Sequence, residues 1–289
     1  MWGSMAREER DLVLEVEEGE DEMGRRVMKL AVLECERLQE HLAPAVFHRT
    51  GGYLQLLENA FTHVVSHAST ILHPQINVPP SLSFTGFDVK AGEYPKDVAE
   101  FDGVLITGSL SGVYDGDAWI HRLLNEIREL DKRRVKTVGI SFGHQAIAQA
   151  LGGHVARNPK GSEVSVRRAW VTKAGEQVFL PSLKEFRLHY HHNDAILKLP
   201  PDFVNLASNN VTEFQSIYKR QQFLTFCGHP DYSHNIEVLE KLLEYDREKL
   251  WVPEQLVEYG LETLSQPTDY EWVIKQILLF YSGAFDKSL

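Results

Sequence analysis

The stretch 138–153, V-G-I-S-F-G-H-Q-A-I-A-Q-A-L-G-G, constrains the fold more than any other part of the chain. It begins in a β-rich run, continues into an alanine-rich segment that favours helix, and ends at two glycines. Ser141 therefore stands in a tight turn between a strand and a helix, with Gly139 and Gly143 leaving room for the neighbouring backbone. This pattern is typical of a nucleophile elbow, in which the next amide N–H faces a developing oxyanion. An ordinary strand-to-helix turn is the alternative.

The segments around the elbow predict an α/β fold. Short apolar runs indicate buried strands, and apolar residues recur at helical spacing in other segments. We expect strands at 28–33, 84–89, 103–107, 135–140, 154–156, 164–171, 186–194 and 222–226, and helices at 53–67, 145–151 and from 117 onward. Alternation of these elements predicts a parallel sheet with helices on both faces. Ligand sites in such folds gather at the carboxyl ends of the strands, where the small-residue loop 108–115 and the elbow both lie.

The end of the chain predicts helices at 233–250, 253–264 and 269–281. Thr268 and Glu271 have the spacing of a capping box for the last helix. Its apolar stripe, Trp272–Tyr281, fits either the core or a dimer face. We expect residues 28–250 to form one domain, with residues 251–289 as C-terminal helices packed on it.

Composition limits the classes of function. The acidic residues 1–27 are expected to form a flexible tail, and Met1–Met5 resembles an expression tag before a natural start. The formal net charge of −11 argues against a nucleic-acid partner. No apolar run is long enough for a membrane span, and no secretory signal or phosphate-binding loop is found. Two cysteines, Cys35 and Cys227, are too few for a disulfide framework and indicate the cytoplasm.

A nucleophile in an elbow needs a base within reach and an acid that orients the base. His229 follows the buried run 222–226, so it lies at the end of a strand as Ser141 does. Asp231 is two residues further on and can bond the other ring nitrogen. We therefore expect Ser141, His229 and Asp231 to form a catalytic triad.

Four segments make the chain recognisable. Residues 139–145, G-I-S-F-G-H-Q, resemble the G-I-C-F-G-H-Q elbow of class I (triad-type) glutamine amidotransferases. Residues 228–231, G-H-P-D, resemble the family's H-P-E in the form found in γ-glutamyl peptidases. Residues 107–115 resemble its oxyanion loop, and residues 160–163 its G-x-E segment. The resemblance covers roughly 28–250 and implies a flavodoxin-like three-layer α/β/α sandwich with a C-terminal helical extension.

The resemblance also implies roles for individual residues. The backbone amides of Ser109 and Phe142 would form the oxyanion hole. Gly108, Gln145 and His192 would help to bind a γ-glutamyl substrate. Glu163 would be a buried structural acid near the pocket, and His192-Asn193-Asp194 falls where the family has H-x-D. No cofactor and no metal are expected.

Two positions depart from the family pattern. Ser141 stands where the family has cysteine, and Asp231 stands where it usually has glutamate. A serine hydroxyl depends wholly on its base, whereas a thiol beside histidine ionises readily. Ser141 is therefore an engineered Cys→Ser trap, the nucleophile of a native serine triad, or part of a native inactive protein. Asp231 slightly favours native divergence.

The leading function is cleavage of a γ-glutamyl amide or peptide bond through an acyl-enzyme, with a small-molecule or peptide substrate and a homodimer as an open option. The alternatives are an inactive relative that binds a metabolite or partner, and a diverged enzyme with different biosynthetic chemistry. Other polar residues have plainer interpretations. His144 is expected to pack or bond structurally, and Cys227 to be buried and inert. The cluster His189, His191, His192 and Asp194 has metal-binding residue types, but ligands two apart on a strand rarely converge, so a pocket-rim loop is preferred.

Overall fold

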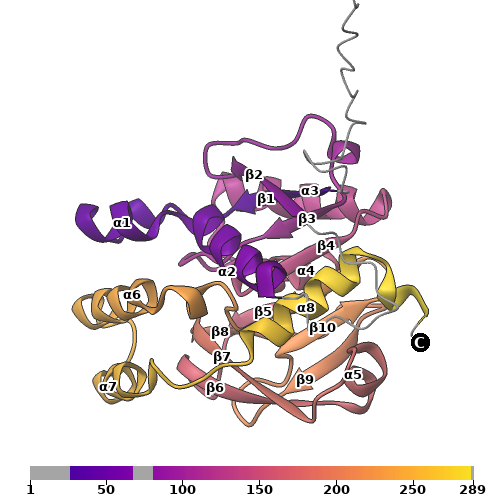
Figure 1. Cartoon of the computed structure of the whole chain (residues 1–289). Helices are drawn as coiled ribbons and strands as arrows, with labels where there is room; N and C mark the ends of the chain where they lie inside the picture. The colour runs from indigo at the N-terminus through magenta and orange to yellow at the C-terminus, as the bar shows by residue number, and fades with distance from the viewer. Residues whose placement is uncertain (1–26, 68–80, 288–289) are drawn as a thin grey trace, which may run out of the picture.

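A mixed nine-stranded sheet forms the centre of the protein (Figure 1). The computed structural model describes residues 27–67 and 81–287, so the predicted acidic tail lies almost entirely outside the described residues. The strand order is β2-β1-β3-β4-β11-β10-β9-β6-β7. The bounds are β1 Val27–Glu34, β2 Ser81–Asp88, β3 Gly103–Ile106, β4 Thr137–Ile140, β6 Glu163–Val171, β7 Glu185–His192, β9 Val204–Ser208, β10 Ser216–Lys219 and β11 Phe223–Phe226.

The first half of the sheet is parallel, as the continuous apolar runs predict. β2, β1, β3, β4 and β11 pair in parallel along the sheet. Every residue of β3, β4 and β11 is buried. The remaining strands, β10, β9, β6 and β7, continue the sheet in antiparallel pairing.

Helices cover both faces of the sheet, which gives three layers (Figure 1). On one face lie α2 (Tyr53–His67) and α8 (Tyr270–Tyr281), and their apolar side chains join one core cluster. On the other face lie α3 (Ala118–Lys132) and α4 (Phe142–Ala150), which belong to a second cluster. Each fully buried Leu, Ile or Phe contributes about 1.5–3 kcal/mol through the hydrophobic effect. Because the apolar side chains of α8 belong to the first cluster, the predicted apolar stripe of the last helix is part of the core.

A third group of helices packs at the end of the molecule where the site lies. α1 (Pro44–Thr50), α6 (Ile236–Lys249) and α7 (Glu254–Thr263) lie together on the left of Figure 1 and share a third apolar cluster. A separate two-stranded sheet pairs β5 (His154–Arg157) with β8 (Asp194–Lys198), and α5 spans Lys173–Val178. Helices α1 and α5 and strands β9 and β10 were not predicted from the sequence.

The predicted capping box at the last helix is wrong. The N-cap of α8 is Asp269, and no side chain caps its amides. Thr268 bonds Ser233 through its hydroxyl, and the Asp269 carboxylate accepts from the Arg187 amide at 2.7 Å. Thr268 thus bonds a side chain of another segment, although the local pattern assigned it to the cap of this helix. Across residues 27–67 and 81–287, no helix has the length and apolar character of a membrane span.

Candidate active site

Three loops meet at the carboxyl ends of three neighbouring strands. The register pairs Ile106 of β3 with Gly139 of β4, and Ile140 of β4 with Phe226 of β11. The residues that follow these strands are the small-residue loop, the elbow and the 227–231 segment. The sheet therefore brings together the three segments in which the sequence predicted an active site.

Ser141 has the backbone of a strained elbow. Its φ of 52° and ψ of −106° lie in a region that residues with side chains rarely adopt. A Cβ on Gly143 would lie 2.3 Å from the Ile106 carbonyl oxygen, and one on Gly139 would lie 2.6 Å from the Gly143 backbone. Both positions therefore require glycine, because strand β3, the elbow and helix α4 approach too closely for any side chain.

A cavity of about 230 Å³ opens over Ser141. It is lined by the elbow residues Ser141, Phe142 and Gln145, the loop residues Ser109–Gly112 with Tyr114 and Asp115, Arg157, the segment His191–Asp194, and Asp246, Trp251 and Val252. Among the predicted site residues, Ser109, Phe142, Gln145 and His192 thus share one cavity with the nucleophile. The polar lining fits a small polar ligand better than an apolar one.

The two amides predicted for the oxyanion hole are available. Phe142 begins α4, so its N–H has no acceptor within the helix. Among the described residues, the Ser109 N–H likewise donates to no backbone group. Because Ser109 and Phe142 both line the cavity beside Ser141, their amides could bind an oxygen that becomes negatively charged there.

His229 lies at the carboxyl end of β11, next to β4 and the elbow in the sheet, and outside the lining of the cavity. Its Nδ1 is 3.3 Å from Asp231 Oδ1 and 3.4 Å from Oδ2, contacts at the long end of hydrogen bonding. Its ring stacks on Tyr232 with centroids 4.1 Å apart and planes 9° from parallel. In the described structure its Nε2 makes no hydrogen bond, and none joins it to the Ser141 hydroxyl.

Gly108 contacts the imidazole and does not line the cavity. A Cβ at Gly108 would lie 2.9 Å from Cε1 of His229 and 2.9 Å from the Tyr53 hydroxyl. That hydroxyl in turn shares a hydrogen bond of 2.6 Å with Tyr232. Tyr53 and Tyr232 thus enclose the imidazole, and neither was identified from the sequence, because their pairing across 179 residues has no local signal.

Two other buried histidines near the site, His144 and His189, form hydrogen bonds through both ring nitrogens. His144 bonds Thr225 at 2.6 Å and the Phe214 carbonyl at 3.0 Å, and burial with the charge of His192 lowers the pKa of His144 to about 3. His189 bonds Ser233 and the Leu264 carbonyl. The structural role predicted for His144 is confirmed.

Two of the three predicted substrate-binding residues, Gln145 and His192, form one unit around Asp194, and Gly108 is not part of it. The Asp194 carbonyl accepts from Nε2 of Gln145 at 3.1 Å and from Nδ1 of His192 at 2.9 Å. The buried Nε2 of His192 faces Glu163 at 3.3 Å, an ionic contact outside hydrogen-bond geometry. Burial lowers the pKa of His192, but the Cys227 sulfur and the Glu163 carboxylate outweigh burial and raise it well above 6.5. His192 is therefore a fixed, charged part of the wall.

Glu163 is the buried acid expected from the sequence. Its carboxylate accepts from Asn209 at 2.6 Å and from Gln215 at 2.8 Å. Burial raises its pKa, but His192 and the amide donors outweigh burial and lower it to about 2. The negative charge on Glu163 thus balances the positive charge on His192.

The rim of the cavity carries His191 and Asp194, as the sequence predicted for the pocket rim, together with Arg157, Tyr114 and Asp246, to which the sequence assigned no role. Arg157 and Asp194 are register partners in the small sheet, and their side chains approach to 3.8 Å. Tyr114 of the small-residue loop donates to Asp194 at 2.7 Å across the mouth of the cavity. Asp246 of α6 is buried and bonds His191 at 2.7 Å. The position of Asp194 in H-x-D was the only signal available for this set.

The histidine cluster of β7 does not converge. His189, His191 and His192 bond Leu264, Asp246 and Asp194 respectively, so their ring nitrogens point to different partners. Within the described residues, one group has spacing compatible with a metal ion, and it lies elsewhere: Glu36, Glu40 and His41. Cys227 is buried and free, like Cys35.

Comparisons with known proteins identify relatives of this chain. A family model for class-I glutamine amidotransferases matches residues 57–243. A glutamine amidotransferase-like protein of Schizosaccharomyces pombe is 32% identical over 192 residues, which cover 65% of this chain and 76% of that protein. Gamma-glutamyl peptidase 4 of Arabidopsis thaliana is 34% identical over 169 residues, which cover 54% of this chain and 66% of that protein.

Solved structures support the fold. A glutamine amidotransferase from Thermotoga maritima superposes with a TM-score of 0.65 at 17% identity, over 90% of this chain and 99% of that chain. One from Methylobacillus flagellatus gives a TM-score of 0.60 at 18% identity, over 90% and 93% of the two chains. The predicted three-layer sandwich of the amidotransferase type is confirmed.

Proposed function

Because this chain belongs to the class-I glutamine amidotransferase family, we propose that it cleaves a γ-glutamyl amide or peptide bond through an acyl-enzyme on Ser141. Two kinds of support combine here. Relatives at similar identity include γ-glutamyl peptidases, and the cavity joins an elbow nucleophile to two available amides.

One observation carries the proposal: of the buried histidines in the described structure, His229 alone has an Nε2 that neither forms a hydrogen bond nor faces a carboxylate. His144 and His189 bond through both nitrogens, and His192 is turned into a buried ion pair. A general base needs one nitrogen held and the other free. His229 meets this requirement, with Nδ1 on Asp231.

The proposed cycle has two halves. The Ser141 hydroxyl attacks the γ-carbonyl carbon while His229 takes its proton, and the amides of Ser109 and Phe142 stabilise the oxyanion. His229 then gives the proton to the leaving amine as the C–N bond breaks. Water attacks the γ-glutamyl ester by the same route in reverse and frees Ser141. A lost oxyanion donor would raise the barrier by about 3–4 kcal/mol.

The wall around Asp194 is the proposed binding site for the α-amino-acid end of the substrate. Gln145 and His192 are both anchored on its carbonyl, and the Asp194 and Arg157 side chains supply opposite charges at the rim. A free α-ammonium and α-carboxylate need such opposite charges. The substrate is therefore a small molecule or peptide with an unblocked γ-glutamyl group.

A second candidate is a member that binds a ligand in this cavity without turnover, or that performs different biosynthetic chemistry there. The serine at the nucleophile position favours it, together with the unmade bond between Ser141 and His229. An engineered Cys→Ser exchange, a native serine enzyme and a native inactive protein remain distinct possibilities for Ser141.

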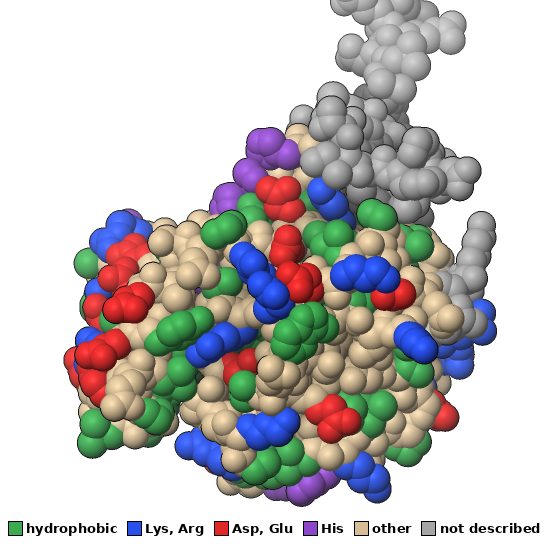
Figure 2. All heavy atoms as spheres, turned by 90° about the horizontal axis from the view of Figure 1, so that it is seen from below, with side chains coloured by type: hydrophobic (Ala, Val, Ile, Leu, Met, Phe, Trp, Pro, Cys, Tyr) green, Lys and Arg blue, Asp and Glu red, His purple; other side chains and the backbone are tan. Residues whose placement is uncertain are grey.

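The setting proposed for this activity is the cytoplasm, because both cysteines are buried free thiols. Nucleic acid is not proposed as a partner, since the net charge is −11 and basic side chains mix with acidic ones on the face in Figure 2. A homodimer is proposed as the assembly, to be checked by sedimentation.

The test is to incubate the protein with glutamine or glutathione and measure its intact mass. We expect a γ-glutamyl adduct on Ser141 and none in Ser141→Ala. Ser141→Cys should turn over at least about 100-fold faster, because a thiolate needs less help from the base. No adduct and no turnover in either protein would reject the hydrolase and favour the second candidate.

A further inference from the structure

Glu36 is a buried carboxylate at the end of β1 that bonds the loop carrying the proposed oxyanion donor. Its side chain is only 2% exposed. Oε2 accepts from the Ser109 hydroxyl at 3.0 Å and from the Leu110 amide at 2.9 Å. The Ser109 hydroxyl also accepts from the Ser111 amide at 3.2 Å, so two loop residues bond Oε2 directly and a third is connected to it through Ser109.

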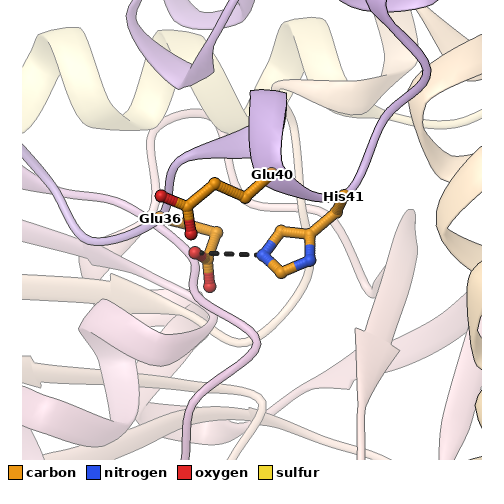
Figure 3. Close-up of side chains that lie close together, drawn as sticks. All are labelled: Glu36, Glu40 and His41. Atoms are coloured by element: carbon orange, nitrogen blue, oxygen red, sulfur yellow. Dashed lines mark ion pairs between the residues drawn. The ribbon is translucent and has the colours of Figure 1, made fainter.

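The other oxygen of Glu36 faces cations. Oε1 bonds the Lys90 ammonium and the Arg37 amide, and it lies 3.2 Å from Nε2 of His41 (Figure 3). Burial raises the pKa of Glu36, but His41 and Lys90 outweigh burial and lower it to about 2. The carboxylate is therefore charged throughout the working pH range and holds the loop with charge-assisted bonds.

The spacing of Glu36, Glu40 and His41 is compatible with a metal ion, but the contacts already made explain the cluster without one. Lys90 and the Arg37 amide already bond Oε1 of Glu36, and the loop residues bond Oε2. Glu40 turns to Arg37 at 3.5 Å, with its side chain about half exposed. The charge of the buried acid is thus matched by side chains of this chain.

We propose that Glu36 is a positioning residue for the oxyanion loop, holding Ser109 and Leu110 so that the Ser109 amide stays directed into the cavity. The Leu110 N–H is bonded to Glu36, which fixes the peptide plane after Ser109. The Ser109 N–H, in the plane before it, remains unbonded at the cavity. Residues that lock an active-site group in this way act through geometry, not through contact with substrate. The kinetic part of this inference rests on the proposed function.

The test combines kinetics with amide hydrogen exchange of residues 108–112. Glu36→Gln should lower kcat for γ-glutamyl hydrolysis about 10- to 100-fold, with KM changed less than about twofold, because an oxyanion donor acts in the transition state. Exchange of the loop amides in the substrate-free protein should be at least about tenfold faster. Glu40→Gln, a neighbouring acid that does not touch the loop, should change neither. Kinetics are measured in the Ser141→Cys protein if Ser141 is slow.

A second variant guards against simple misfolding. Ser109→Ala removes one bond to Glu36 and keeps the Ser109 amide, and its effect on kcat should not add to that of Glu36→Gln. Unchanged exchange and unchanged kcat in Glu36→Gln, or additive effects in the double variant, would overturn the proposal. If every protein is inactive on γ-glutamyl substrates, the proposed function fails, and the exchange measurement alone decides the role of Glu36.

Discussion

Among the imidazole–carboxylate pairs of the candidate site, His192–Glu163 and His229–Asp231 are held very differently. In the His192–Glu163 pair the carboxylate also accepts two amide donors, and the imidazole donates to the Asp194 carbonyl. In the His229–Asp231 pair the contacts are 3.3–3.4 Å long, and among the described residues no other donor reaches the Asp231 carboxylate.

The difference teaches which pair can move a proton. An imidazole that is bonded at Nδ1 and faces a buried carboxylate with Nε2, with its pKa raised well above 6.5, keeps its charge and supports the wall of the cavity. An imidazole held at one nitrogen can accept a proton at the other. The first pair therefore stabilises the wall of the cavity, and the second is the pair that we propose transfers a proton. The loose bond in the second has a simple cause: aspartate is one methylene shorter than the glutamate that the family uses.

The largest effect is expected at the base. His229→Ala should slow formation of the γ-glutamyl-enzyme about 1000-fold, because Ser141 loses its proton acceptor. Rapid-quench mass spectrometry measures the rate, and His121→Ala, an exposed histidine on α3, is the control. A rate within about threefold of the parent would assign the base elsewhere and break the comparison.

The next effect concerns stability. The pKa of Glu163 is lowered to about 2 in the folded protein, so its ionisation stabilises the fold above the unfolded value of 4.5 and is lost as the pH falls toward 2. Glu163→Gln should lower the free energy of unfolding by about 3 kcal/mol at neutral pH, and the deficit should shrink between pH 4.5 and 2. Urea denaturation at several pH values measures this.

The control for that measurement is Glu129→Gln on α3, whose side chain is largely exposed and bonds Lys132. It should change the free energy of unfolding by less than about 0.5 kcal/mol. If the deficit of Glu163→Gln stays constant from pH 7 to pH 3, the carboxylate is not the group that stabilises the wall.

A smaller effect should follow from lengthening the acid. Asp231→Glu should bring the carboxylate nearer to Nδ1 of His229 and raise the acylation rate about 3- to 10-fold. Asp231→Asn, which keeps the length and loses the charge, should lower the rate. A lower acylation rate in Asp231→Glu would mean that the surrounding packing accommodates aspartate and not glutamate. The long contact would then be the functional geometry of the pair.

The smallest effect is expected at Tyr232, whose ring stacks on the imidazole of His229. Tyr232→Phe removes the bond to the Tyr53 hydroxyl and keeps the stack on His229. The free energy of unfolding of Tyr232→Phe should fall by about 1 kcal/mol, and its acylation rate should stay within about threefold of that of the parent protein. Tyr232→Ala also removes the stack and should slow the reaction further. Equal rates for both variants would show that stacking does not hold the imidazole.

Much of the fold was predictable because it is encoded locally. The period of apolar residues gave α2 with its observed bounds, and the continuous apolar runs gave the parallel strands. The antiparallel strands β9 and β10 are short and carry polar residues on both sides, so no clear pattern marked them. The capping box failed because Thr268 found a partner in a distant segment.

By itself the sequence determined the elbow, since two glycines and a serine between a strand and a helix satisfy steric needs that arise within a few residues. It also determined the order of the site segments along the chain. Only the tertiary structure decided what surrounds them: Glu36 under Ser109, Tyr53 on Tyr232, and Asp246 on His191. These contacts join residues 55 to 179 positions apart, and chain distance carries no record of them because packing of the finished sheet and its helices creates them.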